Sequence, residues 1–416
     1  MSSVTFEVRK TCRICGSTDL ELLIDYGFMP LAGGFADTAD RSAFAMFPLR
    51  LFRCRRCTLM QVLDVVNPDM VFRNYSYASS TTQTLRDHFA WMGPEIVERA
   101  GAKGKLAVEF GCNDGVLMRP LLAAGAKALG VDPSDVAFHA SQEQGWPLIT
   151  AYFTERLAGQ IASKYGRAQL ITGNNVFAHV DDVHAIVRGV AVLLSKEGHF
   201  VFEVHYQGDL ISLLQYDTVY HEHLSYYSIR SLEELFRPYG LRIAEVRRIP
   251  IHSGSIRVTV VREQSTLADS PPVRRMIEEE QEWDVWNFTE QVEIRRAGLR
   301  RLVLDLKSAG RRLAAYGAAG RVTILLNYCG LGPDLIDYVA DASPLRYGRY
   351  VPGVGIPIVP PERFRESRPD YAILTAWNYE AEIVAQEQAF LSAGGVFIVP
   401  LPDIRLVRAE RLAAVS

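Results

Sequence analysis

The chain has 416 residues, of which 48% are apolar, and its formal net charge is −3 at pH 7. That length predicts two or three domains with enough apolar residues for their cores. The sequence has no run of eighteen apolar residues and no apolar segment behind its N-terminal charges, so we expect neither a membrane span nor a signal peptide. No long lysine or arginine block is present, which argues against nucleic acid as a partner. We therefore expect a soluble, globular, cytoplasmic protein.

Four of the six cysteines form two CxxC pairs: Cys12 and Cys15 in "CRIC", and Cys54 and Cys57 in "CRRC". Two such pairs complete a tetrahedral zinc site that leaves no position for a substrate. The alternatives are reduced thiols in two unrelated turns, or a zinc ribbon that binds nucleic acid or protein. A ribbon of that kind needs a basic surface, and only "LRLFRCRRC" offers one. We predict a structural zinc site that supplies much of the folding free energy of a small N-terminal domain.

The segment after Lys105 has the alternation expected of a parallel βαβ unit. Residues Leu106 to Phe110 are a short apolar run typical of a buried strand, "GCNDG" breaks the run, and "VLMRPLLAAG" has helical spacing. A second strand, "KALGVDPS", ends near Asp132. Two further strands of the same doubly wound sheet are expected in "AQLITG" and "HFVFEVH".

The turn after the first of these strands indicates what the sheet binds. Gly111 and Gly115 permit a tight turn where backbone approaches a ligand, and Asp132 is placed to accept hydrogen bonds from two ribose hydroxyls. A dinucleotide-binding turn keeps glycines where this chain has Asn113 and Asp114, and the Asp114 carboxylate would repel a pyrophosphate. An acidic turn suits a cationic ligand, which favours S-adenosylmethionine over NAD. A generic strand, turn and helix that binds nothing is the alternative.

Polar residues after the next two strands are candidates for the same pocket. Asn174, Asn175 and His179 follow one strand in "GNNVFAHVDD". After the other comes "QYDTVYHEHLSYYS", which is rich in tyrosine and histidine. A metal site would need a third ligand beyond the two histidines, and a solvated polar loop is the other simple interpretation.

The chemistry of the "YHEH" residues favours an acid–base site. A histidine with an ordinary pKa near about 6.5 is a natural base at neutral pH, and a tyrosine hydroxyl donates well to a developing oxyanion. In a turn, Tyr220 and His223 at positions i and i+3 would face one pocket. We interpret His221, Tyr226 and Tyr227 as structural.

An ordered set of motifs covers nearly the whole chain: the CxxC pairs, "YSYASSTTQTLRDHF", "VEFGCNDG", "NNVFAHVDD", "VYHEHLSYYS", "HSGSIRV" and "YGAAGRVTILLNYCG". Together they resemble the deoxysugar C-3 methyltransferases that act on nucleotide-linked 4-keto sugars in antibiotic biosynthesis. The segment "VEFGCNDG" also resembles the first motif of class I methyltransferases, in which Glu109, Gly111 and Gly115 match the pattern E/D-x-G-x-x-x-G. The resemblance implies a dTDP-linked 4-keto-deoxysugar as substrate.

The resemblance also implies a mechanism. The 4-keto group acidifies the proton on C-3, and a base removes it. The enolate carbon then attacks the sulfonium methyl group in line, and S-adenosylhomocysteine leaves. The family's base is the second histidine of Y-x-E-H, which corresponds to His223. Tyr220 would hold the sugar or its oxyanion, Glu222 would orient or charge-assist the histidine, and His179 matches a second active-site histidine.

A tyrosine that follows the zinc domain also reaches the active site in the resembling family. The segment "NYSY" offers both Tyr75 and Tyr77 for this position. We favour Tyr77, and Tyr75 stays open as the alternative.

The last third of the chain predicts two connecting helices between Pro272 and Ala309, and then a second α/β sheet. Its first strand is expected at Leu313 to Tyr316, before the turn "GAAGR" and a helix. Because this turn is uncharged apart from Arg321, its helix N-terminus would accept a phosphate of a nucleotide sugar. Ser255 and Arg257 in "HSGSIRV" are further candidates for substrate contacts. A purely structural domain is the alternative.

The sequence thus predicts three parts. They are a small zinc-binding domain at 1–78, an S-adenosylmethionine-binding class I methyltransferase domain with a doubly wound sheet at 79–265, and a second Rossmann-like α/β domain at 266–416. We expect a monomeric sugar C-3 methyltransferase. The alternatives are an O- or N-methyltransferase acting on a nucleotide sugar, a non-enzymatic zinc-containing scaffold, and an NAD-linked sugar dehydrogenase, which Asn113 and Asp114 disfavour.

Overall fold

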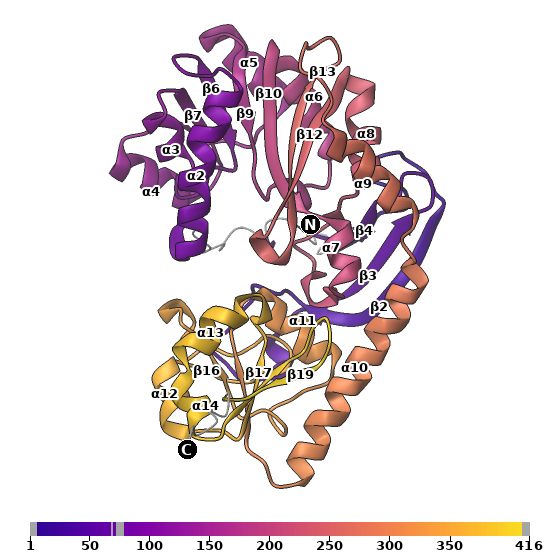
Figure 1. Ribbon diagram of the computed structural model, residues 1–416, viewed down its shortest axis with the longest axis vertical. Helices are drawn as coiled ribbons and strands as arrows, with labels where there is room; N and C mark the ends of the chain where they lie inside the picture. Colours follow the sequence, from indigo (N-terminus) through magenta and orange to yellow (C-terminus); the bar gives the residue numbers. More distant parts are fainter. Residues whose placement is uncertain (1–5, 68–69, 72–78, 410–416) are drawn as a thin grey trace, which may run out of the picture.

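The computed structural model describes residues 6–67, 70–71 and 79–409, and these residues form four β-sheets. The largest sheet has seven strands, the next has six, and the remaining two have four and two. Figure 1 shows the seven-stranded sheet above the six-stranded one. Strands β2 (Leu20–Pro30) and β3 (Met46–Cys54) and the long helix α10 (Val285–Ser308) run along one side of the molecule.

The N-terminal lobe is built from antiparallel strands. Besides β2 and β3, its elements are β1 (Phe6–Val8), η1 (Arg41–Ala43), β4 (Met60–Val62) and β5 (Asp64–Val66). Its four-stranded sheet has the order β11-β4-β3-β2, and β11 (Ser225–Tyr226) comes from the distant "YHEHLSYYS" segment. Ser225 pairs with Gln61 and Tyr226 with Met60. The segment that carries the predicted acid–base residues is therefore hydrogen-bonded into the sheet of the N-terminal lobe.

The seven-stranded sheet has the order β12-β13-β10-β9-β6-β7-β8. Its strands are parallel except β13, which pairs antiparallel with both β10 and β12. The elements of this region are η2 (Ser79–Thr81), α2 (Gln83–Arg99), β6 (Leu106–Phe110), α3 (Met118–Ala123), β7 (Lys127–Val131), α4 (Asp135–Gln144), β8 (Leu148–Ile149), α5 (Glu155–Tyr165), β9 (Ala168–Thr172), η3 (Phe177–His179), α6 (Val183–Leu193), β10 (Leu194–His205), α7 (Gln207–Ser212), η4 (Tyr216–Thr218), α8 (Ile229–Phe236), η5 (Arg237–Tyr239), β12 (Leu241–Ile249), η6 (Ile251–Ser253) and β13 (Ser255–Arg262). The doubly wound sheet expected from the sequence is confirmed.

The six-stranded sheet has the order β16-β15-β14-β17-β18-β19 and is parallel except for β19. The elements of this region are α9 (Pro271–Gln281), α10, β14 (Leu313–Tyr316), α11 (Gly320–Tyr328), β15 (Val339–Ala340), η7 (Pro344–Arg346), β16 (Ile358–Val359), α12 (Pro361–Ser367), β17 (Tyr371–Leu374), η8 (Trp377–Tyr379), α13 (Glu380–Gln386), α14 (Gln388–Ser392), β18 (Val396–Val399) and β19 (Arg405–Val407). The expected helix pair is present as α9 and α10.

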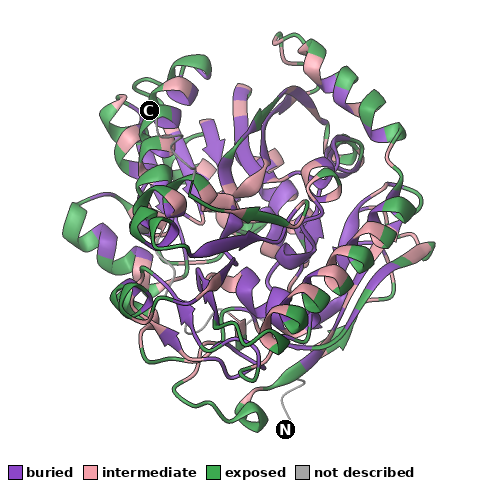
Figure 2. Cartoon of the chain, turned by 60° about the horizontal axis from the view of Figure 1, so that its bottom comes forward, coloured by how far each residue is buried: buried purple, intermediate pink, exposed green. Residues whose placement is uncertain are grey.

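Two hydrophobic cores join the N-terminal lobe to the rest of the chain. One core packs Leu51 and Val62 of the lobe with Ile373 of the six-stranded sheet. The other packs the cysteine pairs with Phe177 and Tyr227 of the middle region. Figure 2 shows the strands of the interior buried and the outer helix faces exposed. The lobe therefore contacts both larger sheets, and burial of apolar surface stabilises each contact.

No helix within the described residues has the length and apolar character that a membrane crossing requires.

Candidate active site

The two CxxC pairs come together at one end of the N-terminal lobe. The four Sγ atoms all lie within 4.8 Å of one another, with 3.5 Å between Cys12 and Cys57 and 3.5 Å between Cys15 and Cys54. A tetrahedral zinc site with Zn–S distances of about 2.3 Å separates its sulfur atoms by about 3.8 Å. The four thiols therefore fit a closed structural zinc site, as the sequence predicted.

The cofactor turn after β6 depends on two glycines with left-handed backbone conformations. Gly111 has φ +68°, and a Cβ there would lie 2.3 Å from Cγ2 of Val176. Gly115 has φ +77°, and a Cβ there would lie 2.8 Å from Nε1 of Trp146. Both the backbone conformation and the neighbouring side chains thus require glycine.

Buried oxygen atoms around this turn lack hydrogen-bond partners within the described parts of the chain. They are Oε2 of Glu109, Oδ1 of Asp114 and Oδ1 of Asn174. Burial raises the pKa of Glu109 well above its usual range, and the nearby carboxylates of Asp132 and Asp114 raise it further. A cationic ligand would satisfy these acceptors and relieve their mutual repulsion. The site therefore fits the sulfonium and α-amino groups of S-adenosylmethionine.

Residues of the cofactor site also make hydrogen bonds with backbone groups of neighbouring segments. Asp132 accepts hydrogen bonds from the backbone N–H groups of Asn113, at 2.9 Å, and Ser134, at 2.8 Å. Oδ2 of Asp114 accepts from the N–H of Ser80 at 2.9 Å. Asn175 has φ +56°, and its N–H donates to the carbonyl of Glu203 at 2.8 Å. The predicted cofactor residues therefore meet at the carboxyl ends of β6, β7, β9 and β10.

Replacing Gly111 with alanine is expected to weaken S-adenosylmethionine binding by at least about tenfold, or 1.4 kcal/mol. The new Cβ would collide with Val176 in a backbone conformation that already disfavours alanine. Isothermal titration calorimetry measures the affinity. Gly145→Ala is the matched control, because Gly145 has φ +75° and a Cβ placed there would have nothing within 4 Å. Equal affinities for the two variants would contradict a specific role of the turn.

The predicted base and its tyrosine are in contact within one loop. The His223 Nδ1–H donates to the carbonyl of Thr218 at 3.1 Å, so Nε2 of the neutral ring is left as an acceptor. The hydroxyl of Tyr220 lies 3.0 Å from this Nε2 and donates to it. The two ring centroids are 4.0 Å apart. The lone pair of His223 is thus aimed at the position of the Tyr220 hydroxyl.

Two more histidines lie beside His223, and a third lies beside one of these two. The ring centroid of His223 lies 5.1 Å from that of His179 and 5.0 Å from that of His205, and the centroid of His252 is 5.8 Å from that of His205. Burial lowers the pKa of His223 well below its ordinary value, and the neighbouring His205 and His179 lower it further. Burial also lowers the pKa of His205 to about 3 and that of His252 to about 4. The cluster therefore holds neutral imidazoles at neutral pH.

His205 and His252 were not predicted as site residues. His205 is the last residue of β10, and ligands bind parallel sheets at the carboxyl ends of their strands. This position in the sequence could have marked His205 as a site residue. His252 lies in "HSGSIRV" with φ +54°, a conformation that no local pattern in this segment predicts.

Among the described residues, the hydrogen bonds of the His223 ring go to Thr218 and Tyr220, so Glu222 does not orient it by a hydrogen bond. A charge-assisting role for Glu222 stays a prediction. Its Oε1 accepts from the backbone N–H of Gly33 at 3.0 Å, and burial raises its pKa. Oε2 is buried and has no hydrogen-bond partner in the described residues. The backbone carbonyl of Glu222 instead accepts from Nδ1 of His179 at 2.6 Å. Glu222 thus connects the loop to the N-terminal lobe and to the second histidine.

The two remaining candidates for the catalytic group, Tyr75 and Tyr77, lie outside the described residues.

Arg321 lies where the two larger sheets meet. Its Nη1 donates to Oγ of Ser253 at 3.3 Å and to Oδ1 of Asn378 at 3.2 Å, and its guanidinium lies 4.9 Å from the centroid of the Trp377 ring. A Cβ on the neighbouring Gly320 would lie 3.9 Å from Cζ of Tyr220. A cavity of about 200 Å³ adjoins this position and is lined by Thr84, Leu85, Pro250, Ile251, His252, Ser253, Asn378, Tyr379, Ala381 and Glu382.

The other two candidates for substrate contacts have partners inside the protein. Arg257 pairs with Glu203 at 2.8 Å and with Glu95 at 2.7 Å. The Ser255 hydroxyl donates to the carbonyl of Ile251 at 3.0 Å. A substrate contact for either residue stays a prediction.

Models of three families match the chain. They are "Putative zinc binding domain" over residues 12–72, "Methyltransferase domain" over 86–246 and "C-methyltransferase C-terminal domain" over 250–402. C-methyltransferase NovU of Streptomyces niveus is 38% identical over 407 residues, which cover 96% of this chain and 97% of NovU. Ubiquinone biosynthesis O-methyltransferase of Proteus mirabilis is 33% identical over 112 residues, or 26% of this chain and 45% of that protein. Magnesium protoporphyrin IX methyltransferase (ChlM) of Synechocystis PCC 6803, solved with bound SAH, has a TM-score of 0.35 and 15% identity over 45% of this chain and 90% of its own.

The order of the seven strands, the cofactor turn and the family matches define a class I S-adenosylmethionine-dependent methyltransferase with a zinc-binding N-terminal domain. The similarity to NovU extends over all three parts of the chain. The chain belongs to the C-methyltransferase family.

Proposed function

We propose that this enzyme methylates C-3 of a dTDP-linked 4-keto-deoxysugar, with His223 as the base, in the biosynthesis of an antibiotic sugar. The family membership supports transfer of the methyl group to carbon. The observation that carries the proposal is the geometry of His223, whose Nδ1 is bound to a carbonyl and whose Nε2 accepts from Tyr220. A buried, neutral imidazole with an oriented lone pair suits proton removal from carbon.

S-adenosylmethionine, when bound, supplies the electrophilic methyl group. His223 receives the C-3 proton at Nε2, in the place now taken by the Tyr220 hydroxyl. The displaced hydroxyl then donates to the oxygen at C-4, where negative charge develops as the enolate forms. The His223 imidazolium is costly in a buried site, so its positive charge is stabilised chiefly by the enolate beside it.

The nucleotide part of the substrate is proposed to lie near Arg321 and the cavity beside it. Ser253 and Asn378, which accept from the guanidinium, both line that cavity. Gly320 begins α11 close to Tyr220, so a diphosphate at this helix N-terminus would be connected to a sugar beside His223. Ser255 and Arg257 are the further residues proposed for this side of the site.

The test is incubation with a labelled methyl donor and a panel of nucleotide-linked 4-keto-deoxysugars that differ in nucleotide and in the C-3 substituent. NMR of the product locates the new methyl group. We expect label on C-3 and dependence on the 4-keto group. Label on oxygen or nitrogen would favour the O- or N-methyltransferase alternative and overturn the proposal.

A further inference from the structure

In each CxxC pair an arginine follows the first cysteine, and the two arginines differ in how far they are buried. Arg55 in the second pair has a side chain that is 58% exposed, and it pairs with Glu21 at the surface. Arg13 holds the same position in the first pair, and its side chain is 0% exposed. Burying a guanidinium is costly unless its charge and its donors are matched. Only the first arginine therefore needs a specific set of partners inside the protein.

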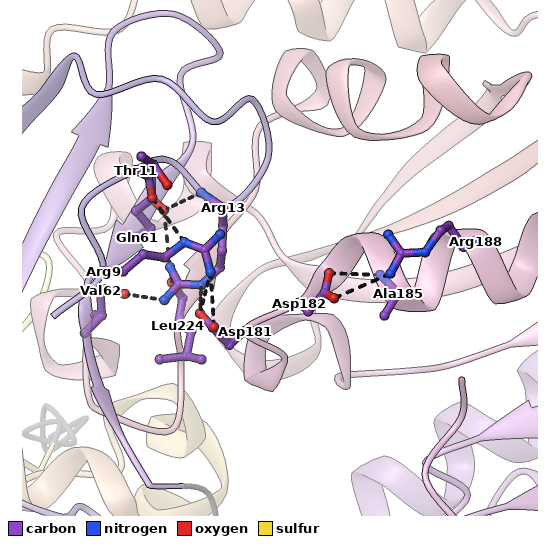
Figure 3. A network of polar contacts seen from close by, with 10 residues as sticks. All are labelled: Arg9, Thr11, Arg13, Gln61, Val62, Asp181, Asp182, Ala185, Arg188 and Leu224. Carbon is purple, nitrogen blue, oxygen red and sulfur yellow. Dashed lines mark hydrogen bonds and ion pairs between the residues drawn. The ribbon is translucent and has the colours of Figure 1, made fainter. Parts of the chain in front are cut away.

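Arg13 has such partners on every nitrogen of its guanidinium (Figure 3). Nε donates to Oδ1 of Asp181 at 3.0 Å, and this carboxylate also pairs with Arg9 at 3.1 Å. Nη1 donates to the carbonyl of Leu224 at 3.0 Å. Nη2 donates to the carbonyl of Val62 at 2.8 Å. The planar fork of an arginine is needed to reach acceptors in three separate segments at once.

Two of these acceptors belong to the loops that carry the site histidines. Leu224 follows His223 directly, and Asp181 is two residues after His179. The loops also bind each other, because the N–H of Leu224 donates to the carbonyl of Ala178 at 2.7 Å. The Arg13 guanidinium therefore binds both of the loops that carry these two histidines.

We propose that Arg13 is a positioning residue for methyl transfer, which connects the first zinc-binding CxxC turn to the loops of His223 and His179 and fixes the separation of the two rings. The proposal rests on the proposed role of His223 as base. In this arrangement the zinc lobe is part of the catalytic apparatus, because the turn that holds the metal also holds Arg13. Asp181 balances the buried charge from the other side.

The position of the loops also sets the surroundings of His223. The titratable groups facing it are His179 from η3, His205 from β10, His252 beyond it on η6, and Tyr220 and Tyr226 of its own segment. Loosening the loop would admit water to this cluster and reduce the desolvation that keeps His223 neutral. The titration of His223 is thus a direct report on the function of Arg13.

The test compares Arg13→Gln and Arg13→Lys with Arg55→Gln, the matched control at the same motif position. Arg13→Gln is expected to lower kcat about 10- to 100-fold, as small misplacements of catalytic groups do, while zinc content and the Kd for S-adenosylmethionine stay unchanged. In the pH profile of kcat/KM, the midpoint of the acid limb should move up toward about pH 6.5, the ordinary pKa of histidine. Arg13→Lys should recover part of the loss, and Arg55→Gln should match the wild type.

A second variant keeps the test valid if Arg13→Gln does not fold. Asp181→Asn leaves Arg13 in place and is expected to show a smaller loss of kcat with the same direction of shift in the acid limb. A uniform loss of activity with an unmoved acid limb, or a parallel loss in Arg55→Gln, would overturn the proposal.

One readout does not depend on the proposed reaction. The NMR titration of the His223 imidazole, assigned by comparison with His223→Asn, is recorded without substrate. If it shifts in Arg13→Gln, Arg13 positions the loop even if His223 proves not to be the base. If it does not shift, Arg13 has no positioning role, whatever the reaction.

Discussion

Replacing His223 with asparagine is expected to lower kcat by about 10²- to 10⁴-fold, the usual contribution of a general base. Asparagine removes the Nε2 lone pair toward which the Tyr220 hydroxyl points, so nothing at this position takes the proton from C-3. The Kd for S-adenosylmethionine should stay unchanged, because the residue is separate from the cofactor turn. Single-turnover kinetics and calorimetry measure the two quantities.

His221→Asn is the matched control for that substitution. His221 belongs to the same HxH pair, but its Nε2 donates to the carbonyl of Pro48 at 3.1 Å, away from the histidine cluster. Its kcat should stay close to the wild-type value. In deuterated solvent, the wild type should exchange the C-3 proton in the presence of S-adenosylhomocysteine, and His223→Asn should not. Exchange or near-normal turnover in His223→Asn would exclude it as the base.

The depressed pKa of His223 also predicts the pH dependence of the reaction. The base must be neutral to accept a proton, and its folded-state pKa lies well below the ordinary value of about 6.5. Activity should therefore persist as the pH falls through 6.5 and decline only at lower pH.

Removing the zinc is expected to unfold the N-terminal lobe and abolish methyl transfer. Structural zinc contributes about 10 kcal/mol or more in small zinc domains, which is comparable to the whole stability of a typical domain. Cys54→Ser takes away one of the four thiolates that converge within 4.8 Å of one another. We expect the zinc content of that variant to fall from about one ion per chain toward zero and the Tm to drop steeply.

The control for the zinc experiment is Cys329→Ser. Cys329 is buried but lies at the end of α11, where its sulfur contacts the Tyr216 hydroxyl at 3.4 Å. Its zinc content should equal that of the wild type by elemental analysis. A Cys54→Ser variant with full zinc content, or with full activity and no zinc, would refute the structural role of the metal.

Local sequence patterns were sufficient for the parts of the fold that depend on nearest neighbours. The apolar runs Leu106–Phe110 and Leu313–Tyr316 are the strands β6 and β14, because glycine-bounded apolar runs form buried parallel strands. The long strand β2 was not predicted. Its pairing with β3 shifts register between Leu22 and Ile24 and again between Asp25 and Phe28, which destroys the alternation of apolar and polar residues.

In the candidate site, too, contacts within one segment could be predicted from the sequence, and contacts between distant segments could not. The i, i+3 spacing of Tyr220 and His223 predicted their shared pocket, and the structure has them in hydrogen-bond contact. The hydrogen bonds from Gly33 to Glu222 and from Arg13 to Leu224 could not be predicted, because each joins residues about two hundred positions apart. Only the three-dimensional arrangement of the N-terminal lobe shows that Gly33 meets the carboxylate of Glu222.

The pairing of β4 with β11 has a consequence for how this enzyme can be assembled and recombined. Gln61 is synthesised long before Ser225, its partner in the sheet, so the lobe completes its sheet only after most of the middle region has left the ribosome. The N-terminal lobe therefore cannot complete its sheet without the Ser225–Tyr226 strand of the middle region. A chimera that takes its zinc lobe from one relative and the methyltransferase domain from another must preserve this strand pairing, or it will separate the metal site from the loop that carries His223.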